Sequence, residues 1–239
     1  MLQLALAAGG MAAVFSAGYQ SMSPTGQWYG QTFTGLPSGS KKLALTYDDG
    51  PNDPHTLHLL EVLDKHKVRA TFFLIGRYVK QRPDIAREIA QAGHAIGNHT
   101  FSHPNLIFAS ARKTRTELQG CEQALYDAVG QHSRLFRPPF GGRRPVTLRI
   151  ACSLGLEPVM WSVTGWDWSA KPAEYVEKKV YKQIRGGDVI LLHDGGHAEL
   201  GIDRSQTVIV TDRLIARYKA EGYDFVTVAE MKGKAIPGG

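Results

Sequence analysis

The 239-residue sequence is poor in cysteine, which limits how the chain can be stabilised. Its two cysteines, Cys121 and Cys152, cannot build a disulfide framework. Cys121 shares an i, i+3, i+4 stripe with Leu118 and Leu125, so we expect a small buried hydrophobic residue on a helix rather than a bridge. Neither cysteine has the Cys/His spacing of a metal site.

Long runs of basic residues are also missing. The 28 Lys and Arg against 22 Asp and Glu leave a net charge of +6, which favours an anionic surface or polymer as partner. The basic residues are scattered in short pairs such as Arg143-Arg144, without the interleaved aromatic residues of a nucleic-acid platform. We therefore expect no nucleic-acid partner.

The first forty residues contain no charged side chain. Residues 2–17 are nearly all apolar or small, and Ser16-Ala17-Gly18 offers a small-residue cleavage site, so residues 1–18 are interpreted as an export segment. The segment lacks a basic start and is short for a bilayer core of about 30 Å. We expect a secreted or cell-envelope protein without a stable membrane span, an uncleaved anchor being the alternative.

After an irregular Gly-, Ser- and aromatic-rich arm at residues 19–40, strand and helix patterns alternate over residues 41–239, which we interpret as one catalytic domain. Helical faces are predicted around Leu59 to Leu63, from Pro83 to Gly93, and around Thr211 to Tyr218, which would line the last helix. This alternation predicts an α/β fold, a parallel sheet closed or nearly closed into a barrel. The seven predicted strands are Leu43 to Tyr47, Ala70 to Ile75, His94 to Asn98, Leu135 to Arg137, Pro158 to Val163, Asp188 to Leu192 and Asp224 to Val228.

Polar and turn-forming residues follow four of these strands. They are Asp48 to Pro51, His99, Pro138 to Gly141, and His193 with Asp194. Because a (β/α) barrel gathers the carboxyl ends of its strands on one face, we expect these segments to form one active-site rim.

The segment His99 to His103 has i, i+4 spacing, which on a helical turn places two imidazoles within reach of one metal ion. Two solvated or capping histidines are the alternative for this pair taken alone. The carboxylates of Asp48 and Asp49 favour a metal, because two His and one carboxylate leave open positions for water and substrate. Both aspartates reach the site only if Gly50-Pro51 turns the chain there; an N-cap or Asx turn is the alternative for either.

These motifs resemble those of the polysaccharide deacetylase family, also called the NodB-homology domain or carbohydrate esterase family 4. The resemblance covers residues 41 to the end and rests on Thr46 to Pro51, His99 to His103, and Arg137 to Gly141. It implies a distorted (β/α) barrel of about seven parallel strands, in agreement with the strand count. It further implies that Asp48 is the general base and that Asp49, His99 and His103 are the metal ligands. The resemblance assigns Arg137 to orienting the base and the backbone N–H of Phe140 to binding the oxyanion.

The last two motifs are present with one departure. The family's Asp-x-x-Asp-Trp reads Thr164-Gly-Trp-Asp167-Trp168 here, so its first aspartate is replaced by threonine. By resemblance Asp167 orients the catalytic histidine, and Trp168 and Leu191 line the acetyl pocket. The same resemblance makes His193 the general acid. A further histidine, His197, is interpreted as a solvated loop residue.

The resulting expectation is an enzyme, a metal-dependent hydrolase of N-acetyl groups on a sugar polymer or oligomer. Zn²⁺ is the preferred metal, although other divalent ions accept the same ligands. Peptidoglycan or chitin-like N-acetylglucosamine units are the first substrates to consider. The alternatives are an acetylxylan esterase, a small-molecule amide or formamide hydrolase, and a carbohydrate-binding protein that has lost activity.

Overall fold

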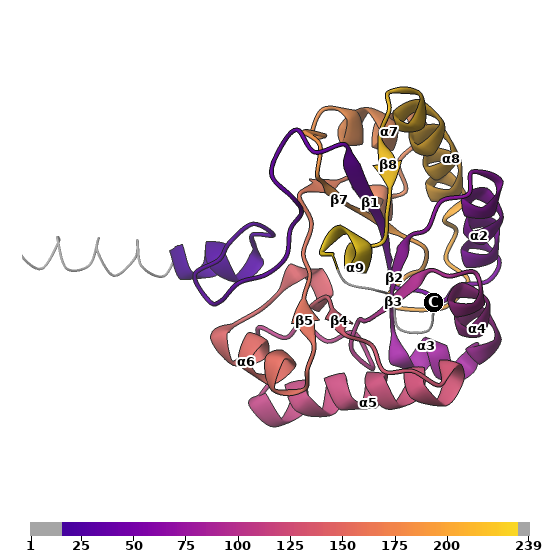
Figure 1. The fold of residues 1–239 in the computed structure, drawn as a ribbon. Coiled ribbons are helices and arrows are strands. Elements are labelled where there is room, and N and C mark those ends of the chain that lie inside the picture. Colours follow the sequence, from indigo (N-terminus) through magenta and orange to yellow (C-terminus); the bar gives the residue numbers. More distant parts are fainter. Residues whose placement is uncertain (1–15, 234–239) are drawn as a thin grey trace, which may run out of the picture.

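The computed structural model describes residues 16–233, and these form a curled parallel sheet surrounded by helices (Figure 1). The predicted export segment at residues 1–18 lies almost entirely outside the described residues. None of the described helices is both long and apolar enough to cross a membrane. The strands are β1 (Lys42–Asp48), β2 (Thr71–Leu74), β3 (Ala95–Asn98), β4 (Leu135–Phe136), β5 (Glu157–Pro158), β6 (Val163–Thr164), β7 (Val189–His193) and β8 (Asp224–Phe225).

The strand order along the sheet is β5-β4-β3-β2-β1-β7-β6, with β8 pairing to the beginning of β1. Every strand pair is parallel, which confirms the predicted α/β barrel. The sheet is not fully closed: its two ends, β5 and β6, follow one another in the chain but do not pair.

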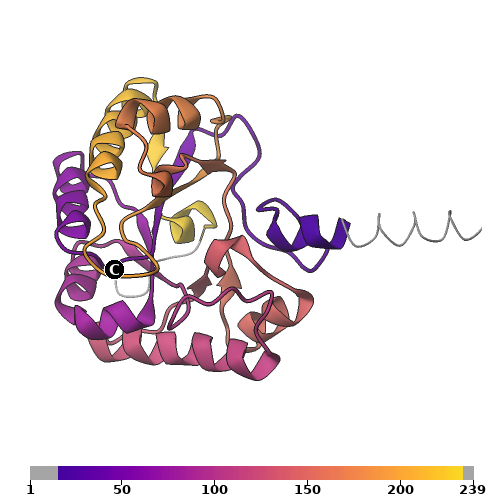
Figure 2. The same cartoon turned by 180° about the vertical axis from the view of Figure 1, so that it is seen from behind.

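Helices cover the outer face of the sheet, as both views show (Figures 1 and 2). The connections between consecutive parallel strands contain helices, except for the loop between β5 and β6. The helices are α2 (His55–Lys65), α3 (Gly76–Gln81), α4 (Pro83–Gln91), α5 (Ala111–Val129), α6 (Pro145–Ser153), α7 (Ala173–Tyr181), α8 (Ser205–Ala220) and α9 (Val228–Met231), with short 3₁₀ turns η1 (Pro139–Gly141) and η2 (Asp167–Ser169).

The hydrophobic core has two layers because side chains alternate along each strand. On β1, Leu43, Leu45 and Tyr47 belong to the outer cluster against the helices. Ala44 belongs to a smaller inner cluster with Phe73 and residues of β7 and α9. The inner face of β1 is therefore the face that leads to Asp48.

Two sequence-based boundaries are wrong. The predicted strand from Pro158 to Val163 is two strands, β5 and β6, which lie at opposite ends of the sheet. The last strand ends at Phe225, and Val228 begins α9, so α8 is not the last helix. Cys121 lies buried on α5 as predicted, and both cysteines are free.

Candidate metal centre and active site

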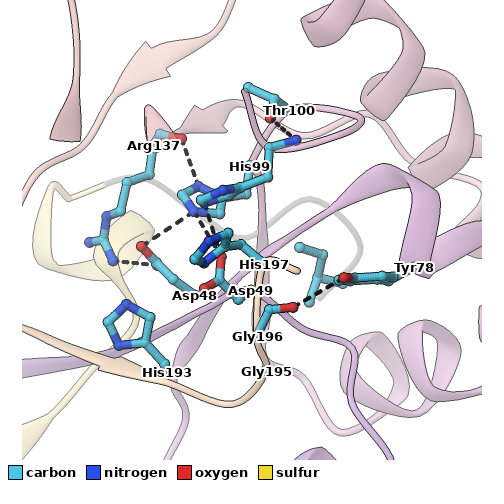
Figure 3. A network of polar contacts seen from close by, with 12 residues as sticks. Asp48, Asp49, Tyr78, His99, Thr100, Arg137, His193, Gly195, Gly196 and His197 are labelled. Carbon is cyan, nitrogen blue, oxygen red and sulfur yellow. Dashed lines mark hydrogen bonds and ion pairs between the residues drawn. The ribbon is translucent and has the colours of Figure 1, made fainter. Parts of the chain in front are cut away.

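Strand alternation brings Asp48 and His193 side by side at the inner face of the sheet. The two are register partners on the neighbouring parallel strands β1 and β7, and each is the last residue of its strand. Each side chain therefore leaves the carboxyl end of a strand on the side where Arg137 also lies (Figure 3).

Asp49 starts the turn that the sequence predicted after β1. Its φ of 75° is left-handed, so the chain changes direction immediately after the strand. Gly50 is required in this turn, because a Cβ there would meet a carboxylate oxygen of Asp194 at 2.1 Å. The turn lets Asp49 and Asp48 reach the same site although they are neighbours in the chain.

The predicted ligands Asp49, His99 and His103 lie together, with one candidate ligand atom from each within 4.8 Å of the others. The prediction that the two histidines lie on a helical turn is wrong. Residues 99–103 form a loop in which Thr100 and His103 have positive φ values of 66° and 61°. The loop, rather than a helix face, brings both imidazoles to one point.

The arrangement of these three side chains fits a divalent metal ion. The ring Nδ1 of His99 bonds the carbonyl of Arg137 at 2.8 Å, which leaves its Nε2 free to face Asp49. The Nε2 atoms of His103 and His99 lie 3.1 and 3.5 Å from Asp49 Oδ1, yet this buried oxygen makes no hydrogen bond among residues 16–233. Three donor atoms that converge without bonding one another are what a shared cation requires.

The electrostatics of the cluster agree with this arrangement. Burial alone would raise the pKa of Asp49, but the adjacent His103 and His99 hold it well below its usual range. Burial lowers the pKa of His103, which keeps that imidazole neutral as a ligand must be. Burial opposes ionisation of His99 too, yet the Asp48 and Asp49 carboxylates raise its pKa. The carboxylates that raise the pKa of His99 are the negative charge that a bound divalent cation would balance.

Asp48 is held by a fully buried arginine. Arg137 Nη1 donates to Asp48 Oδ1 at 2.7 Å and to the Thr46 hydroxyl at 2.8 Å. Its other donors bond the carbonyls of Val159 and Met160 at 3.3 and 3.1 Å. The guanidinium is thus fixed from both sides, which fixes the orientation of the Asp48 carboxylate.

His193 is held by Asp167 from the opposite side of the site. Its Nδ1 lies 2.9 Å from Asp167 Oδ1, and its backbone N–H donates to Oδ2 at 2.7 Å. The Thr207 hydroxyl also donates to Oδ2, at 2.9 Å. Burial alone would lower the pKa of His193, but the Asp167 carboxylate and the other nearby carboxylates raise it to about 9. The imidazolium form, which can give up a proton, is therefore favoured near neutral pH.

The predicted pocket residues lie around these groups. Phe140 packs its ring edge against His103, with centroids 4.7 Å apart, and Trp168 packs edge-on against His193 at 5.3 Å. Both rings are about half exposed, at 46% and 47%. Leu191 is buried on β7, two residues before His193 and on the same face of the strand. Phe140 has a left-handed φ of 57°, so its backbone leaves the strand direction at the rim.

Thr164 occupies the position where the family motif has its first aspartate. It lies on β6 and pairs with Leu191. Its backbone N–H and carbonyl bond the Gln183 side chain at 3.3 and 2.8 Å. The departure from the motif thus falls beside the pocket wall, and the Asp48, Asp49 and His193 contacts are all made without it.

The sequence interpretation missed the contacts of His197. The residue is exposed in the loop after β7, as expected, but its ring stacks on His103 with centroids 5.0 Å apart and an interplanar angle of 23°. It also packs edge-on against Phe140 at 5.2 Å. The loop is held by Tyr78, whose hydroxyl donates to the Gly196 carbonyl at 3.1 Å (Figure 3). No spacing rule links position 197 to position 103, so the sequence held no sign of this stack.

Asp194 was likewise not assigned a role from the sequence. It is fully buried, receives a hydrogen bond from Thr56, and its Oδ1 has no partner in the part of the chain that the structure describes. Burial, reinforced by the Asp49 and Asp48 carboxylates, raises its pKa to about 7. Its backbone N–H donates to the Asp48 carbonyl at 3.1 Å, so Asp194 supports the turn that carries Asp49.

Comparison with known proteins shows which family this chain resembles. Residues 35–159 match the polysaccharide deacetylase family. A peptidoglycan-N-acetylglucosamine deacetylase of Bacillus cereus is 34% identical over 201 residues, covering 82% of this chain and 90% of the relative. A chitooligosaccharide deacetylase of Azorhizobium caulinodans is 37% identical over 161 residues, covering 67% and 77%.

Solved structures share the fold. A crystallised peptidoglycan N-acetylglucosamine deacetylase superposes with a TM-score of 0.78 at 34% identity, covering 86% of this chain and 94% of the other. A CE4 family pseudoenzyme from Bacillus anthracis superposes with a TM-score of 0.77 at 26% identity, covering 90% and 80%. Similarity of fold thus extends to a protein without activity, so function has to be argued from the site.

Proposed function

The chain belongs to the polysaccharide deacetylase family, and from this premise we propose that it hydrolyses N-acetyl groups on N-acetylglucosamine units of peptidoglycan or chitin-like oligomers. The observation that carries the proposal is the convergence of three units on one face: the Asp48–Arg137 ion pair, the Asp49 cluster and the His193–Asp167 pair. Binding a sugar alone would not require this combination.

The proposed roles follow from which atoms are free. Asp48 pairs with Arg137 through Oδ1, so its second carboxylate oxygen accepts the proton of an attacking water. His193 gives its Nδ1 to Asp167 and keeps Nε2 for the departing sugar amine, which it protonates. The two residues thus begin the reaction in opposite protonation states, as base and acid must.

Asp49, His99 and His103 would hold a divalent cation, which when bound supplies Lewis-acid polarisation of the acetyl carbonyl. We propose Zn²⁺, because two imidazoles and one carboxylate are a common hydrolytic zinc set. The Phe140 backbone N–H is proposed as a second donor to the developing oxyanion, next to this cluster.

The apolar start of the chain and the proposed substrates agree with action at the cell envelope, which we propose as the location. Acetylxylan ester and small formamide substrates remain candidates for the same chemistry, since both offer an acyl carbonyl to the same groups.

Acetate release from chitooligosaccharides, peptidoglycan and acetylxylan, measured side by side with added Zn²⁺, tests the function. We expect release from the two N-acetylglucosamine substrates and its loss in His193→Ala. Release from acetylxylan alone would move the assignment to an esterase. Binding of glycans without any acetate release would make the chain a pseudoenzyme and reject the proposal.

A further inference from the structure

A basic groove runs between α5 and α6 on the outer wall of the barrel, away from the residues of the candidate site. We call it the arginine groove. It is an open groove of about 410 Å³, lined by the side chains of Arg112, Arg115, Arg149, Ser153, Val146 and Ile150. Figure 1 shows the two helices lying next to each other.

The three arginines bring unbalanced positive charge to this groove. All three side chains are exposed, and none forms an ion pair with a carboxylate within residues 16–233. Glu117, the acidic residue nearest to Arg115 in the sequence, is paired with Lys113 at 2.7 Å. Elsewhere, exposed arginines such as Arg213 and Arg217 do have carboxylate partners. A groove with three guanidinium groups that lack a carboxylate partner in the described part of the chain attracts an anion.

The side chains that line the groove come from two helices, which form its two walls. Arg112 and Arg115 are i, i+3 neighbours on α5, and Arg149 and Ser153 are i, i+4 neighbours on α6, so each pair lies on one helix face. Arg115 Nη2 donates to Ser153 Oγ at 3.1 Å, which joins the walls. Guanidinium groups bind carboxylates in a bidentate manner, whereas the apolar floor of Val146 and Ile150 suits the face of a sugar ring.

The two helices that form the groove follow, in the chain, two loops of the candidate site. α5 begins after the loop that carries His103, and α6 begins after the turn that carries Phe140. Arg144, the residue before α6, donates a hydrogen bond to the carbonyl of Ala109, just before α5. The groove and the candidate site are therefore connected through these two loops of the chain.

We propose that the arginine groove is an auxiliary binding site for a carboxylate-bearing glycan, and that it makes the enzyme prefer peptidoglycan, whose peptide stems carry carboxylates, over neutral chitin-like oligomers. This inference rests on the proposed deacetylase function. The groove acts by raising the occupancy of the anionic polymer at the site, and it takes no part in the chemistry.

The test replaces the three arginines in Arg112→Gln/Arg115→Gln/Arg149→Gln. Glutamine keeps the helix propensity and most of the side-chain length while removing the charge. The control is Arg87→Gln/Lys178→Gln/Lys182→Gln, which removes three exposed cations: one on α4, one on α7 and one directly after α7. Both variants therefore lower the net charge by the same amount. Acetate release is measured at low salt on soluble peptidoglycan fragments and on neutral N-acetylglucosamine hexamer.

We expect the groove variant to lose about tenfold in kcat/KM on peptidoglycan fragments, through KM, with the hexamer rate unchanged and the loss reduced at high salt. The control variant should keep the wild-type ratio between the two substrates. Equal ratios in the groove variant and the wild type would overturn the proposal. The proposal would also be overturned if the groove variant, unlike the control variant, lost binding to phosphatidylglycerol vesicles while its kinetics on peptidoglycan stayed unchanged. A wild type inactive on both substrates would instead reject the deacetylase function itself.

Discussion

At the scale of single residues, the site depends on separating two adjacent aspartates with identical chemistry. Asp48 ends β1 facing Arg137, whereas Asp49 has a left-handed backbone and faces His99 and His103. One carboxylate is therefore held by a cation of the chain and the other is left for an external cation. Their neutral variants should fail in different ways.

We expect Asp49→Asn to lower metal affinity, because an amide is a weaker ligand than a carboxylate, and its activity to recover partly with excess metal. Asp48→Asn should retain metal and lose about 10² to 10⁴ in rate that no metal concentration restores. Metal content and acetate-release rate across a metal titration distinguish the two. Loss of metal in Asp48→Asn with retention in Asp49→Asn would show that the roles are reversed.

The pH dependence of the rate should depend on Asp167. The His193 imidazolium, with a pKa raised to about 9, loses its proton as pH rises, so activity should fall on the alkaline side. A divalent cation bound nearby would lower this pKa somewhat. In Asp167→Asn the carboxylate that stabilises the imidazolium is removed, so the pKa of His193 falls and the alkaline limb moves to lower pH by about one unit or more. A pH–rate profile measures the shift.

An alkaline limb at the same pH in Asp167→Asn and wild type would contradict the general-acid role of His193. The conservative control is Thr207→Val, which removes one hydrogen bond to Asp167 but leaves its charge, and which should move the limb far less.

At the scale of elements, strands were predicted from apolar runs in the sequence. The prediction was wrong where tertiary contacts split one apolar run into two strands. The segment Pro158 to Val163 reads as one strand, but the carbonyls of Val159 and Met160 accept hydrogen bonds from the Arg137 side chain. Those carbonyls are used by a side chain instead of a sheet partner, and the chain crosses from one end of the sheet to the other. The contact comes from a residue about twenty positions away, so local pattern does not reveal it.

The His99 to His103 loop shows the opposite case, where the right residues were identified for a wrong local reason. Spacing predicted a helical turn, but Thr100 and His103 are left-handed, and Asn98 and Thr100 side chains cap the loop's backbone N–H groups at 2.9 and 3.1 Å. Polar caps of this kind compete with helix formation. Residue type and order were enough to predict the ligands, but not the backbone conformation of the loop that carries them.

The loop after β7 is the element where we expect a role in substrate binding. His197→Ala removes a ring that stacks on His103 and packs edge-on against Phe140, which opens that side of the site. We expect KM for chitooligosaccharides to rise several-fold, about 1 kcal/mol for one lost aromatic contact, with metal content retained. The matched control is His132→Ala, another exposed histidine stacked on an aromatic ring, Tyr126, on α5. Equal KM values in the two variants would contradict a role of His197 in substrate binding.

At the scale of the whole molecule, the gap in the sheet is covered by the arm that precedes the barrel. Phe33 pairs with Val159, and its N–H donates to the Pro158 carbonyl at 2.9 Å, while Leu36 N–H donates to the Gly187 carbonyl at 2.8 Å. The arm thus bridges the segment after β5 to the segment before β7. Its Gly- and Ser-rich composition predicted an irregular segment but gave no sign of where it would dock, because docking depends on backbone groups far away in the chain.

Arg143 is the residue that ties this arm to the active-site rim. The residue is 1% exposed, and its guanidinium donates to the carbonyls of Ser23 and Gly26 at 2.7 Å each, and to that of Gly141, next to Phe140, at 3.0 Å. We expect Arg143→Met, which keeps the aliphatic stem, to leave the carbonyls of Gly26 and Gly141 unpaired and to lower the free energy of unfolding by about 2–4 kcal/mol. Because Gly141 is released as well, acetate release should also fall.

The measurement is a urea unfolding midpoint together with limited proteolysis of residues 24–32, where loss of the anchor should expose the backbone. The neighbouring Arg144→Met is the control, since Arg144 is only half-buried and bonds Ala109 rather than the arm. We expect Arg144→Met to retain the wild-type cleavage rate in the arm. If Arg143→Met kept both the midpoint and the protease resistance of the wild type, the backbone hydrogen bonds of the arm would be enough to hold it, and the coupling of the arm to the Phe140 turn through the guanidinium would be wrong.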